Sequence, residues 1–254
     1  GLADLYFRFD PLAGLGAMLA SRRWVPRLAL GLATLGLTLV FGRVWCGWLC
    51  PLGTLLEWAH FRPGKPRPVT LTPRWRVVKH VVLLLTLAGA LFGSLSLLAL
   101  DPLAILTRTA TVAVLPALNR AVTAVEAALY PIALLQPALD GLDAALRGPV
   151  LPLEPPAFAQ NVAIAALFAG LLALNVVAER FWCRYLCPLG ALLGLLAKVA
   201  LLRPAIGAAC SRCARCTRAC RLGAIAADPD YAIVPAECTV CLDCLAACPE
   251  RGNG

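Results

Sequence analysis

The cysteines near the C-terminus have a spacing that suits iron–sulfur chemistry. Eight of the twelve cysteines fall in two runs of the form CxxCxxCxxxC. In two-cluster bacterial ferredoxins, the first three cysteines of such a run bind one [4Fe-4S] cluster and the fourth binds the other cluster. The spacing therefore predicts two clusters whose ligands are exchanged between the runs. The predicted ligands are Cys210, Cys213, Cys216 and Cys248 for one cluster, and Cys238, Cys241, Cys244 and Cys220 for the other.

Zinc is the alternative for these eight cysteines, because zinc also binds four thiolates. Zinc sites use paired CxxC elements, however, and not two interleaved triplets with a distant fourth ligand. Between the runs, a turn at residues 228–230 and a short apolar strand at residues 231–234 predict a small α+β domain over residues 205–254. So short a domain cannot bury enough apolar surface to fold alone, so we expect metal binding to drive its folding.

The other four cysteines form two CxxxCP pairs, Cys46 with Cys50 and Cys183 with Cys187. Residues four apart share one face of a helix, so each pair offers two thiols in one direction, and the proline ends one helix or begins another. One hypothesis is that the four thiols converge on a single redox centre, such as a third iron–sulfur cluster. Redox-active thiols and plain packing at a helix junction are the alternatives.

The two CxxxCP pairs belong to an internal repeat. Residues 43–56 and 180–193 are identical at ten of fourteen positions. The related strings FDPLAGL and LDPLAIL lie upstream of them, at residues 9–15 and 100–106. Each unit therefore consists of a DPLA segment, an apolar helix and a CxxxCP pair.

We place the two repeat units at about residues 1–62 and 80–204. Units that run in the same direction are related by an axis along the membrane normal, which would bring the two cysteine pairs face to face. The second unit has an apolar segment before its DPLA string, whereas the first has none. We therefore expect a further helix or domain upstream of Gly1.

Composition indicates a membrane protein. Hydrophobic residues make up 60% of the chain, charged residues make up 15%, and the mean hydropathy is +0.79. Soluble chains have roughly 45–50% apolar and about 25% charged residues. Three stretches are long and apolar enough to cross a hydrocarbon core of about 30 Å. They are residues 24–45, 80–100 and 157–178.

Residues 101–156 contain many prolines, and charged residues interrupt their apolar runs. We therefore predict interfacial amphipathic helices there, with a fourth spanning helix as the alternative. The predicted fold class is an all-α polytopic membrane domain over residues 1–204, with three spanning helices and a pseudo-repeat, followed by the α+β two-cluster domain over residues 205–254.

Loop charges predict the orientation. The loop at residues 62–79 carries six lysines or arginines and no acid, so the positive-inside rule places it in the cytoplasm. Three crossings then put the cysteine-rich tail on the cytoplasmic side of a bacterial inner membrane. With this loop, the tail arginines account for the net charge of +9, so nucleic-acid binding is not predicted.

Several polar residues have weaker chemical interpretations. Arg212, Arg215, Arg218 and Arg221 could contact anionic lipid, raise a cluster potential, dock an acidic carrier or simply be solvated. The two histidines, His60 and His80, would both be needed for a bis-histidine haem. Glu57 and His60 could carry protons during quinol oxidation, although a solvated loop role is the simpler interpretation.

The strings WCGWLCPLG and WCRYLCPLG, together with the two cysteine runs, resemble those of the NapH/NosR-type membrane polyferredoxins. The resemblance covers nearly the whole chain. It implies a polytopic inner-membrane protein that moves electrons between the quinone pool and redox partners, with its ferredoxin domain in the cytoplasm. Some family members carry an outer flavin-binding domain before their first helices, and no flavin-linking motif is evident in these residues.

Two functions follow as hypotheses. The first is an iron–sulfur electron-transfer subunit that takes electrons from quinol or a cytoplasmic donor and delivers them to a partner reductase. The second is an accessory or regulatory protein that reduces a metal or a disulfide of a partner enzyme. A transporter is disfavoured, because no predicted span carries a buried charge. The expected partners are membrane lipid, quinone and a redox protein.

Overall fold

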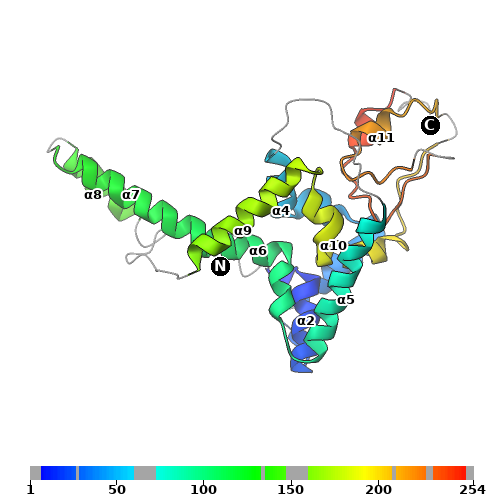
Figure 1. Ribbon diagram of the computed structural model, residues 1–254, viewed down its shortest axis with the longest axis horizontal. Coiled ribbons are helices and arrows are strands. Elements are labelled where there is room, and N and C mark those ends of the chain that lie inside the picture. Colours follow the sequence, from blue (N-terminus) through cyan, green and yellow to red (C-terminus); the bar gives the residue numbers. More distant parts are fainter. Residues whose placement is uncertain are drawn as a thin grey trace. The chain divides into compact units, whose positions relative to one another are not determined.

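Helices make up nearly all the regular structure in the computed structural model of the chain (Figure 1). The structure describes residues 7–26, 29–59, 73–132, 135–146, 160–207, 210–226 and 231–249. It contains two compact units, residues 1–104 with 171–254 and residues 105–170. The predicted all-α character of the membrane part agrees with these helices. The predicted domain boundary between residues 204 and 205 stays a prediction.

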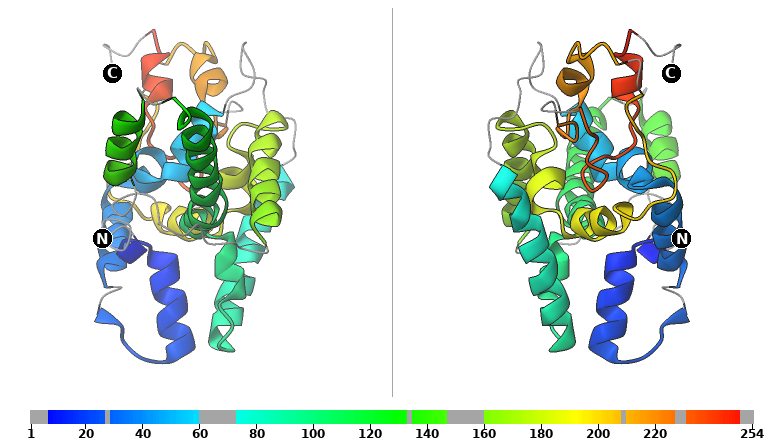
Figure 2. Two further views of the ribbon diagram at one scale, coloured as in Figure 1. Left: turned by 90° about the vertical axis from the view of Figure 1, so that its left-hand side faces the viewer. Right: turned by 90° about the vertical axis from the view of Figure 1, so that its right-hand side faces the viewer.

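Four helices form the core of the first unit. α5 packs against both α2 and α10, and α3 packs against α2 and α10 as well. Figures 1 and 2 show α2 and α5 lying side by side. Buried leucines lie in this core, such as Leu12 on α2, Leu83 on α5 and Leu193 on α10. The bounds are α2 (Pro11–Ser21), α3 (Leu30–Phe41), α5 (Val78–Leu91) and α10 (Pro188–Ala197).

Prolines of the repeated DPLA and CPLG strings start four helices. Proline suits the first helical position because its fixed φ matches the helix and its missing N–H is not needed there. The residue before each proline can accept hydrogen bonds from the free amides of the first turn. Asp10 does so for α2, and the Cys187 sulfur does so for α10. The other two helices that start in this way are α4 (Pro51–Trp58) and α6 (Pro102–Thr109).

The first cysteine of each CxxxC pair lies on one turn of π-helix, and the second cysteine directly follows that turn in an extended conformation. The two turns are η2 (Trp45–Leu49) and η7 (Trp182–Leu186). The N–H of Cys50 donates to the carbonyl of Trp45, and the N–H of Cys187 donates to the carbonyl of Trp182, both at 2.9 Å. The Pro-Leu-Gly that follows each pair is the first turn of a helix rather than a separate turn. The two repeats therefore share one local backbone.

The three predicted spanning helices are shorter in the structure than the sequence predicts. Of residues 24–45, positions 27 and 28 lie outside the described residues, and the α-helix among the rest is α3, with 12 residues. Residues 80–100 contain most of α5, which ends before Gly93 at a φ of +80°, and then the separate 3-10 turn η4 (Ser96–Leu100). Of residues 157–178, positions 157–159 lie outside the described residues. The rest form α9 (Asn161–Ala173) and η6 (Leu174–Val176).

One helix within the described part of the chain is long and apolar enough to cross a bilayer, by length and composition, and it lies where we predict interfacial helices. This helix runs over Pro102–Leu129, 28 residues, or about 42 Å at 1.5 Å per residue. It comprises α6, the π-turn η5 (Ala110–Val114) and α7 (Leu115–Leu129). These residues are helical, as predicted, and whether they lie at the interface or cross the membrane stays a prediction.

The π-turn explains why Pro116 does not break this helix. A proline inside a regular helix collides with the carbonyl four residues before it and cannot donate to that carbonyl. The wider π-turn η5 comes directly before α7, so Pro116 takes a place in the first turn of α7, where no donor is required. The helix continues through a residue that the sequence pattern treats as a stop.

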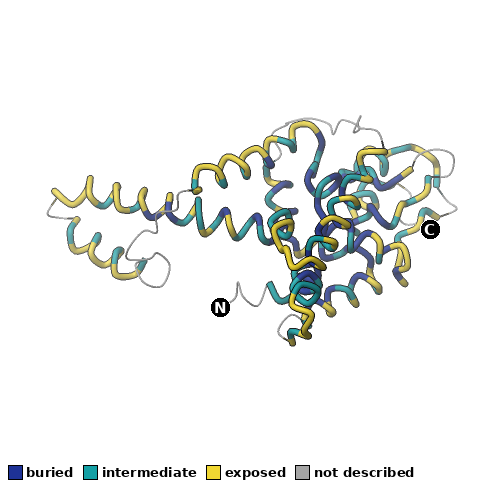
Figure 3. Tube along the Cα trace, turned by 60° about the horizontal axis from the view of Figure 1, so that its bottom comes forward, coloured by how far each residue is buried: buried dark blue, intermediate teal, exposed yellow. Residues whose placement is uncertain are grey.

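The second unit, residues 105–170, is largely exposed (Figure 3). Only 11% of the most apolar 18-residue window of Pro102–Leu129 is buried inside the structure. Exposed apolar side chains include Val114, Leu118 and Val125. The same unit contains α8 (Gln136–Leu146). Such a helix surface suits contact with lipid.

The tail contains two short helices, α11 (Arg215–Ala219) and α12 (Asp243–Ala246). The predicted strand at residues 231–234 is reduced to one antiparallel bridge between Ile225 and Ile233. The predicted turn at residues 228–230 lies outside the described residues. No strand longer than this bridge occurs in the described part of the tail, so the α+β class of this domain is not confirmed.

Candidate metal centres

The two cysteine runs of the tail have the same backbone. In each run, the residues on either side of the second cysteine, Cys213 or Cys241, adopt a left-handed conformation. Non-glycine residues seldom take this conformation, and functional sites are where such strain concentrates. After it, each run enters a short helix, α11 or α12. The φ values are 53° and 57° at Arg212 and Ala214, and 54° and 66° at Val240 and Leu242.

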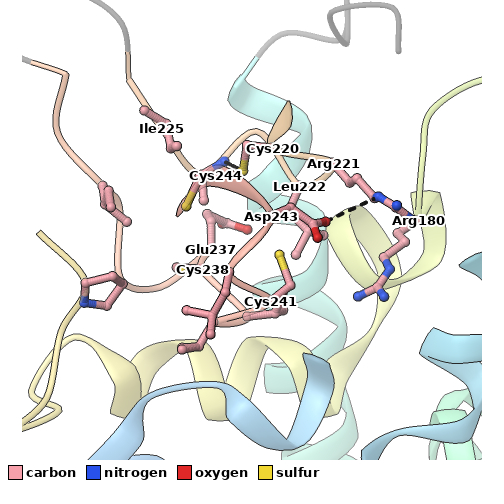
Figure 4. Close-up of a pocket in the computed structure, with 16 residues that line it drawn as sticks. Arg180, Cys220, Arg221, Leu222, Ile225, Glu237, Cys238, Cys241, Asp243 and Cys244 are labelled. Atoms are coloured by element: carbon pink, nitrogen blue, oxygen red, sulfur yellow. Dashed lines mark hydrogen bonds and ion pairs between the residues drawn. The ribbon is translucent and has the colours of Figure 1, made fainter. Parts of the chain in front are cut away.

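Each predicted ligand set surrounds one pocket. The first pocket is lined by the sulfur-bearing residues Cys220, Cys238, Cys241 and Cys244 (Figure 4). The second pocket is lined by Cys210, Cys213, Cys216 and Cys248, and Cys244 also reaches its edge. The structure thus brings the fourth cysteine of each run to the first three cysteines of the other run. These are the sets that the sequence predicts, and their role as ligands stays a prediction.

The thiols of the first pocket lie in a poorly solvated place. Burial raises the pKa of the Cys238, Cys241 and Cys244 thiols above the ordinary value. By contrast, a hydrogen bond with the backbone of Arg215 lowers the pKa of the exposed Cys213 thiol. A buried thiolate needs a positive partner, and iron supplies one. The sulfur of Cys220 already accepts a hydrogen bond from the Ala224 N–H at 3.2 Å.

The donor set fits cubane clusters better than single ions. Among the described residues, no three side chains of the ligand types stand close enough together to hold one metal ion. In a cluster of four irons, each of the four thiolates binds its own iron, so the sulfurs need not meet at one point. Four sulfurs spread around a pocket are the arrangement that such a cluster requires.

The four CxxxCP cysteines form a second group. Electrostatic interactions connect Cys50 with Cys46 and Cys183, and connect Cys187 with the same two residues. Cys50 and Cys187 are buried, and each precedes the first residue of a helix, where the helix N-terminus favours a thiolate. The Gly190 N–H donates to the sulfur of Cys187 at 3.2 Å. The two pairs are therefore close enough to interact electrostatically, and their convergence on one metal centre stays a prediction.

A buried arginine lies beside this group without enough acceptors. Arg43 is 1% exposed and interacts with Cys46 and Cys187. Its Nε and Nη2 have no hydrogen-bond partner in the described structure. A Cβ on Gly190 would lie 2.8 Å from this Nη2, so glycine is needed for the close approach. Glu237 lies on the Nη1 side of this guanidinium, and a thiolate-bound iron–sulfur cluster at the CxxxCP cysteines would supply an anion for the free donors, Nε and Nη2.

The first repeat also binds the tail directly. Arg43 Nη1 donates to the Ala236 carbonyl at 2.8 Å, and Trp48 Nε1 donates to the Val240 carbonyl at 2.9 Å. A Cβ on Gly47 would collide with the Thr239 carbonyl oxygen. Residues 43–48 thus lie against residues 236–240, which contain the first cysteine of the second run. The CxxxCP group and the first tail pocket therefore lie on segments that contact each other.

A buried ion pair holds the same junction. Lys79 Nζ donates to both carboxylate oxygens of Glu237, at 2.6 Å and 2.7 Å, and Arg43 Nη1 lies 3.9 Å from the same carboxylate. Lys79 and Glu237 are 1% and 5% exposed. Removing one member of such a pair leaves a buried charge, which costs about 3–5 kcal/mol. This pair therefore fixes the position of Cys238.

The second repeat meets the end of the first cysteine run. Arg184 is 4% exposed and acts electrostatically on Cys220. A Cβ on Gly223 would lie 2.6 Å from Arg184 Nη2. Nearby, Arg76 Nη2 donates to the Gly223 carbonyl at 2.8 Å. The turn that follows Cys220 is therefore surrounded by cations.

Other residues that the sequence singled out have structural partners. Glu57 binds Arg180 at 2.7 Å and also binds Arg221, so its carboxylate is paired and not placed as a proton carrier. Arg221 also lies 3.5 Å from Asp243 (Figure 4). His80 Nδ1 lies 3.1 Å from the Arg76 carbonyl. His60 lies outside the described residues, so the haem alternative is untested.

Arginines 212, 215 and 218 are exposed, whereas Arg221 is half-buried and pairs with the two carboxylates just described. Sequence reasoning missed Arg43, Lys79 and Glu237. One signal could have identified Arg43, because the repeat conserves an arginine three residues before the first cysteine of each pair, at positions 43 and 180. No local signal pairs Lys79 with Glu237, which are 158 residues apart.

Comparison with known proteins identifies the repeated segments. A family model described as 4Fe-4S binding domain matches residues 24–68 and 160–208. These two segments contain the CxxxCP cysteines and end before Cys210. No solved structure matches the chain.

Two curated relatives match across most of the chain. Protein NirI of Paracoccus denitrificans is 30% identical over 260 residues, which cover 95% of this chain and 31% of that protein. Regulatory protein NosR of Pseudomonas aeruginosa is 31% identical over 218 residues, which cover 81% of this chain and 24% of that protein. The chain thus spans between a quarter and a third of the length of these relatives. The chain carries a 4Fe-4S binding segment in each repeat and is similar, over most of its own length, to NirI and NosR.

Proposed function

We propose that this protein carries electrons in a bacterial inner membrane, between the quinone pool or a cytoplasmic donor and a partner reductase. The tail would hold two [4Fe-4S] clusters and lie in the cytoplasm. Cys46, Cys50, Cys183 and Cys187 would hold a third iron–sulfur centre. When bound, these clusters supply one-electron carriers, and the chain's own residues fix their spacing and charge.

The observation that carries this proposal is the contact between the first repeat and the second cysteine run. Electron transfer requires centres that are close to one another and held rigidly. Arg43 touches the CxxxCP group with one edge and donates to the Ala236 carbonyl with another. Contacts of Gly47 and Trp48 with Thr239 and Val240 place the segment around Cys46 against the segment around Cys238. A centre at the CxxxCP group would therefore carry electrons between quinone and the tail clusters.

Buried cations around both centres support the same function. Arg43 faces the CxxxCP group, Arg184 faces Cys220, and Arg180 lies in the wall of the first tail pocket. A positive charge beside a redox centre stabilises its reduced, more negative form. Such charges make electron acceptance from a donor easier. Arg43 and Arg180 also have structural partners, Ala236 and Glu57, so these cations would serve both packing and electron acceptance.

Iron and acid-labile sulfide counts test the number of centres. We expect about twelve of each per chain in anaerobically purified protein, from four irons per cubane. The double variant Cys46→Ser/Cys183→Ser should lose about four irons and keep the tail signals. The double variant Cys213→Ser/Cys241→Ser should instead lose the tail clusters. A wild-type count of about eight that is unchanged in the first variant would remove the third centre from the proposal.

A redox titration followed by electron paramagnetic resonance tests the donor. At least two [4Fe-4S] signals should appear, and a quinol analogue should reduce them in membranes. Clusters that respond to no quinol but respond to a reduced cytoplasmic ferredoxin would leave the carrier role intact and replace the donor. Clusters that respond to neither would contradict electron transfer.

A regulatory or maturation role is the second candidate. One relative is named Regulatory protein NosR, and its match covers 81% of this chain. In that role the protein would reduce a metal or a disulfide of a partner enzyme. Loss of a reductase's activity in a deletion strain, with normal metal content of that reductase, favours the first role. Loss of its metal content favours the second.

A further inference from the structure

The surface around the second tail pocket is open to a partner. Of the twelve cysteines, Cys213 alone is exposed. It is one of the four predicted ligands that line this pocket. The first pocket lies on segments that contact the first repeat, so its side is partly covered. A cluster in the second pocket would therefore be the one that a partner protein can approach most closely.

Three exposed arginines lie beside Cys213 along the chain. Arg212 precedes it directly, and Arg215 and Arg218 lie on the helix that follows, α11. Arg218 Nη2 lies 3.5 Å from the Cys213 carbonyl oxygen, so this guanidinium stands next to the cysteine. Among the residues that the structure describes, no carboxylate pairs with any of the three arginines. Their charges are therefore free to attract an anionic surface.

The described acids of the tail pair with other cations. Glu237 is buried against Lys79, and Asp243 lies 3.5 Å from Arg221. The fourth arginine of the series is thus paired, whereas the three exposed arginines keep their positive charge at the surface. A charged protein surface attracts a partner of opposite charge and raises the rate of encounter.

Exposed apolar side chains lie at the same pocket. Leu242 and Leu245 line it and are 46% and 52% exposed. Tyr231 also lines it, and the Tyr231 hydroxyl donates to the Arg212 carbonyl at 3.1 Å, which places apolar and basic residues side by side. Protein interfaces combine an apolar centre with a polar rim. A basic face that is only solvated does not need exposed leucines beside it.

This surface lies away from the helices that we predict to lie in the membrane. Figures 1 and 2 show α11 at one end of the first unit and α2 toward the other end. α2 packs against α5, which belongs to the predicted span at residues 80–100. Anionic lipid headgroups also bind arginines, but only at the membrane surface. The position of α11 therefore favours a soluble protein as the partner.

We infer that this surface, formed by Arg212, Arg215, Arg218, Leu242 and Leu245, docks a small acidic iron–sulfur carrier protein. The inference rests on the proposed function and names its cytoplasmic partner. One electron leaves the reduced carrier and reduces the cluster of the second pocket, and no bond or proton moves. Cys244 lines both tail pockets, so the electron can pass on to the first pocket and the repeats.

Binding of oxidised plant-type ferredoxin, a small acidic [2Fe-2S] protein, tests the surface without electron transfer. The full chain is held in nanodiscs of zwitterionic phosphatidylcholine. Arg215→Gln/Arg218→Gln should weaken binding at low salt and flatten its salt dependence, because screened charges no longer contribute. Arg22→Gln/Arg23→Gln is the matched control, since these exposed arginines follow α2, and it should bind as wild type does. Equal losses in the two variants would overturn the inference.

Lipid retention separates the two anionic partners. Native mass spectrometry measures how much phosphatidylglycerol stays bound to wild type and to Arg215→Gln/Arg218→Gln. We expect the two proteins to retain the same amount. Loss of phosphatidylglycerol in the variant, with ferredoxin binding unchanged, would assign the arginines to lipid and overturn the docking surface.

Stopped-flow reduction of the tail clusters by reduced ferredoxin gives the functional measurement. The second-order rate constant at low salt should be at least about tenfold lower in Arg215→Gln/Arg218→Gln than in wild type. Dithionite, a small reductant that needs no docking, should reduce the clusters of both proteins alike. Wild-type clusters that quinol reduces but ferredoxin does not would overturn this inference and leave the proposed function intact.

Discussion

The two CxxxCP repeats have the same backbone but make different contacts with the tail. WCGWLCPLG and WCRYLCPLG both form a π-turn followed by a proline-started helix. Between the cysteines they differ at two positions. Gly47 and Trp48 in the first repeat correspond to Arg184 and Tyr185 in the second.

These differences match the two cysteine runs. The first repeat lies against Thr239 and Val240, next to Cys238 in the second run. The second repeat lies against Gly223, just after Cys220 at the end of the first run. The identical residues place the four cysteines, whereas the differing residues adapt each copy to its own part of the tail. Duplication alone does not account for this division of roles.

The equivalent arginines show the same division. Arg43 donates to Ala236 of the tail and interacts with two cysteines of the CxxxCP group. Arg180 instead binds Glu57 and acts on Cys183. One arginine therefore connects the two candidate centres, and the other joins the first repeat to the second.

The largest effect is expected from Gly47→Ala, which removes the feature that only the first repeat has. A Cβ at this position meets a backbone carbonyl, which cannot swing away as a side chain can. Overpacking of this kind costs about 1–3 kcal/mol, and occasionally more. We expect a lower unfolding midpoint in detergent and loss of iron from the set that contains Cys238.

Gly36→Ala is the matched control for this prediction. Gly36 lies on α3, and nothing lies within 4 Å of the position that its Cβ would take. Alanine is the better helix former, so this variant should be as stable as wild type or slightly more stable. Equal losses in the two glycine variants would show that the tail does not dock on Gly47.

Arg184→Met should have a moderate effect, confined to one tail cluster. It removes a buried cation that acts on Cys220 and replaces it with a side chain of similar length. At an effective dielectric of about 20 and several ångströms, such a charge is worth on the order of 1–2 kcal/mol. The midpoint potential of the cluster bound by Cys220 should fall, because its reduced form loses a favourable interaction.

Two further variants define the result for Arg184. Arg184→Lys keeps the charge and should keep most of the potential. Arg218→Met removes an exposed arginine of the same run and should change the potential much less, since solvent screens that charge. If Arg218→Met shifts the potential as much as Arg184→Met, the buried cation has no special role.

Local features of the structure could be predicted from the sequence. The helical class, the pairing of the fourth cysteine of each run with the other run, and the proximity of the two CxxxCP pairs all follow from spacing and repetition. Asp-Pro and Cys-Pro start helices because a proline and a capping acceptor act within three residues. Each of these inferences depends only on residues that are close in sequence or related by the repeat.

Features that depend on distant residues or on compensation could not be predicted. Pro116 reads as a helix stop, and only the π-turn before it lets the helix over Pro102–Leu129 continue. Lys79 reads as a loop charge near a membrane surface, yet it pairs with Glu237 of the tail. The apolar stretch at residues 80–100 reads as one span because hydropathy does not register the break at Gly93.

The smallest effect is expected when Trp48 and Tyr185, which occupy equivalent positions in the two repeats, are each replaced by phenylalanine and the free energies of unfolding are compared. Trp48 Nε1 donates to the Val240 carbonyl at the protein surface, so Trp48→Phe should cost about 0.5–1.5 kcal/mol, the net worth of one hydrogen bond. The buried Tyr185 hydroxyl has no hydrogen-bond partner in the described structure, so Tyr185→Phe should be neutral or slightly stabilising. Chemical unfolding of both variants in detergent measures the difference. A larger loss for Tyr185→Phe would mean that its hydroxyl has a partner at the bound cluster, and that the second repeat also contacts a centre through this position.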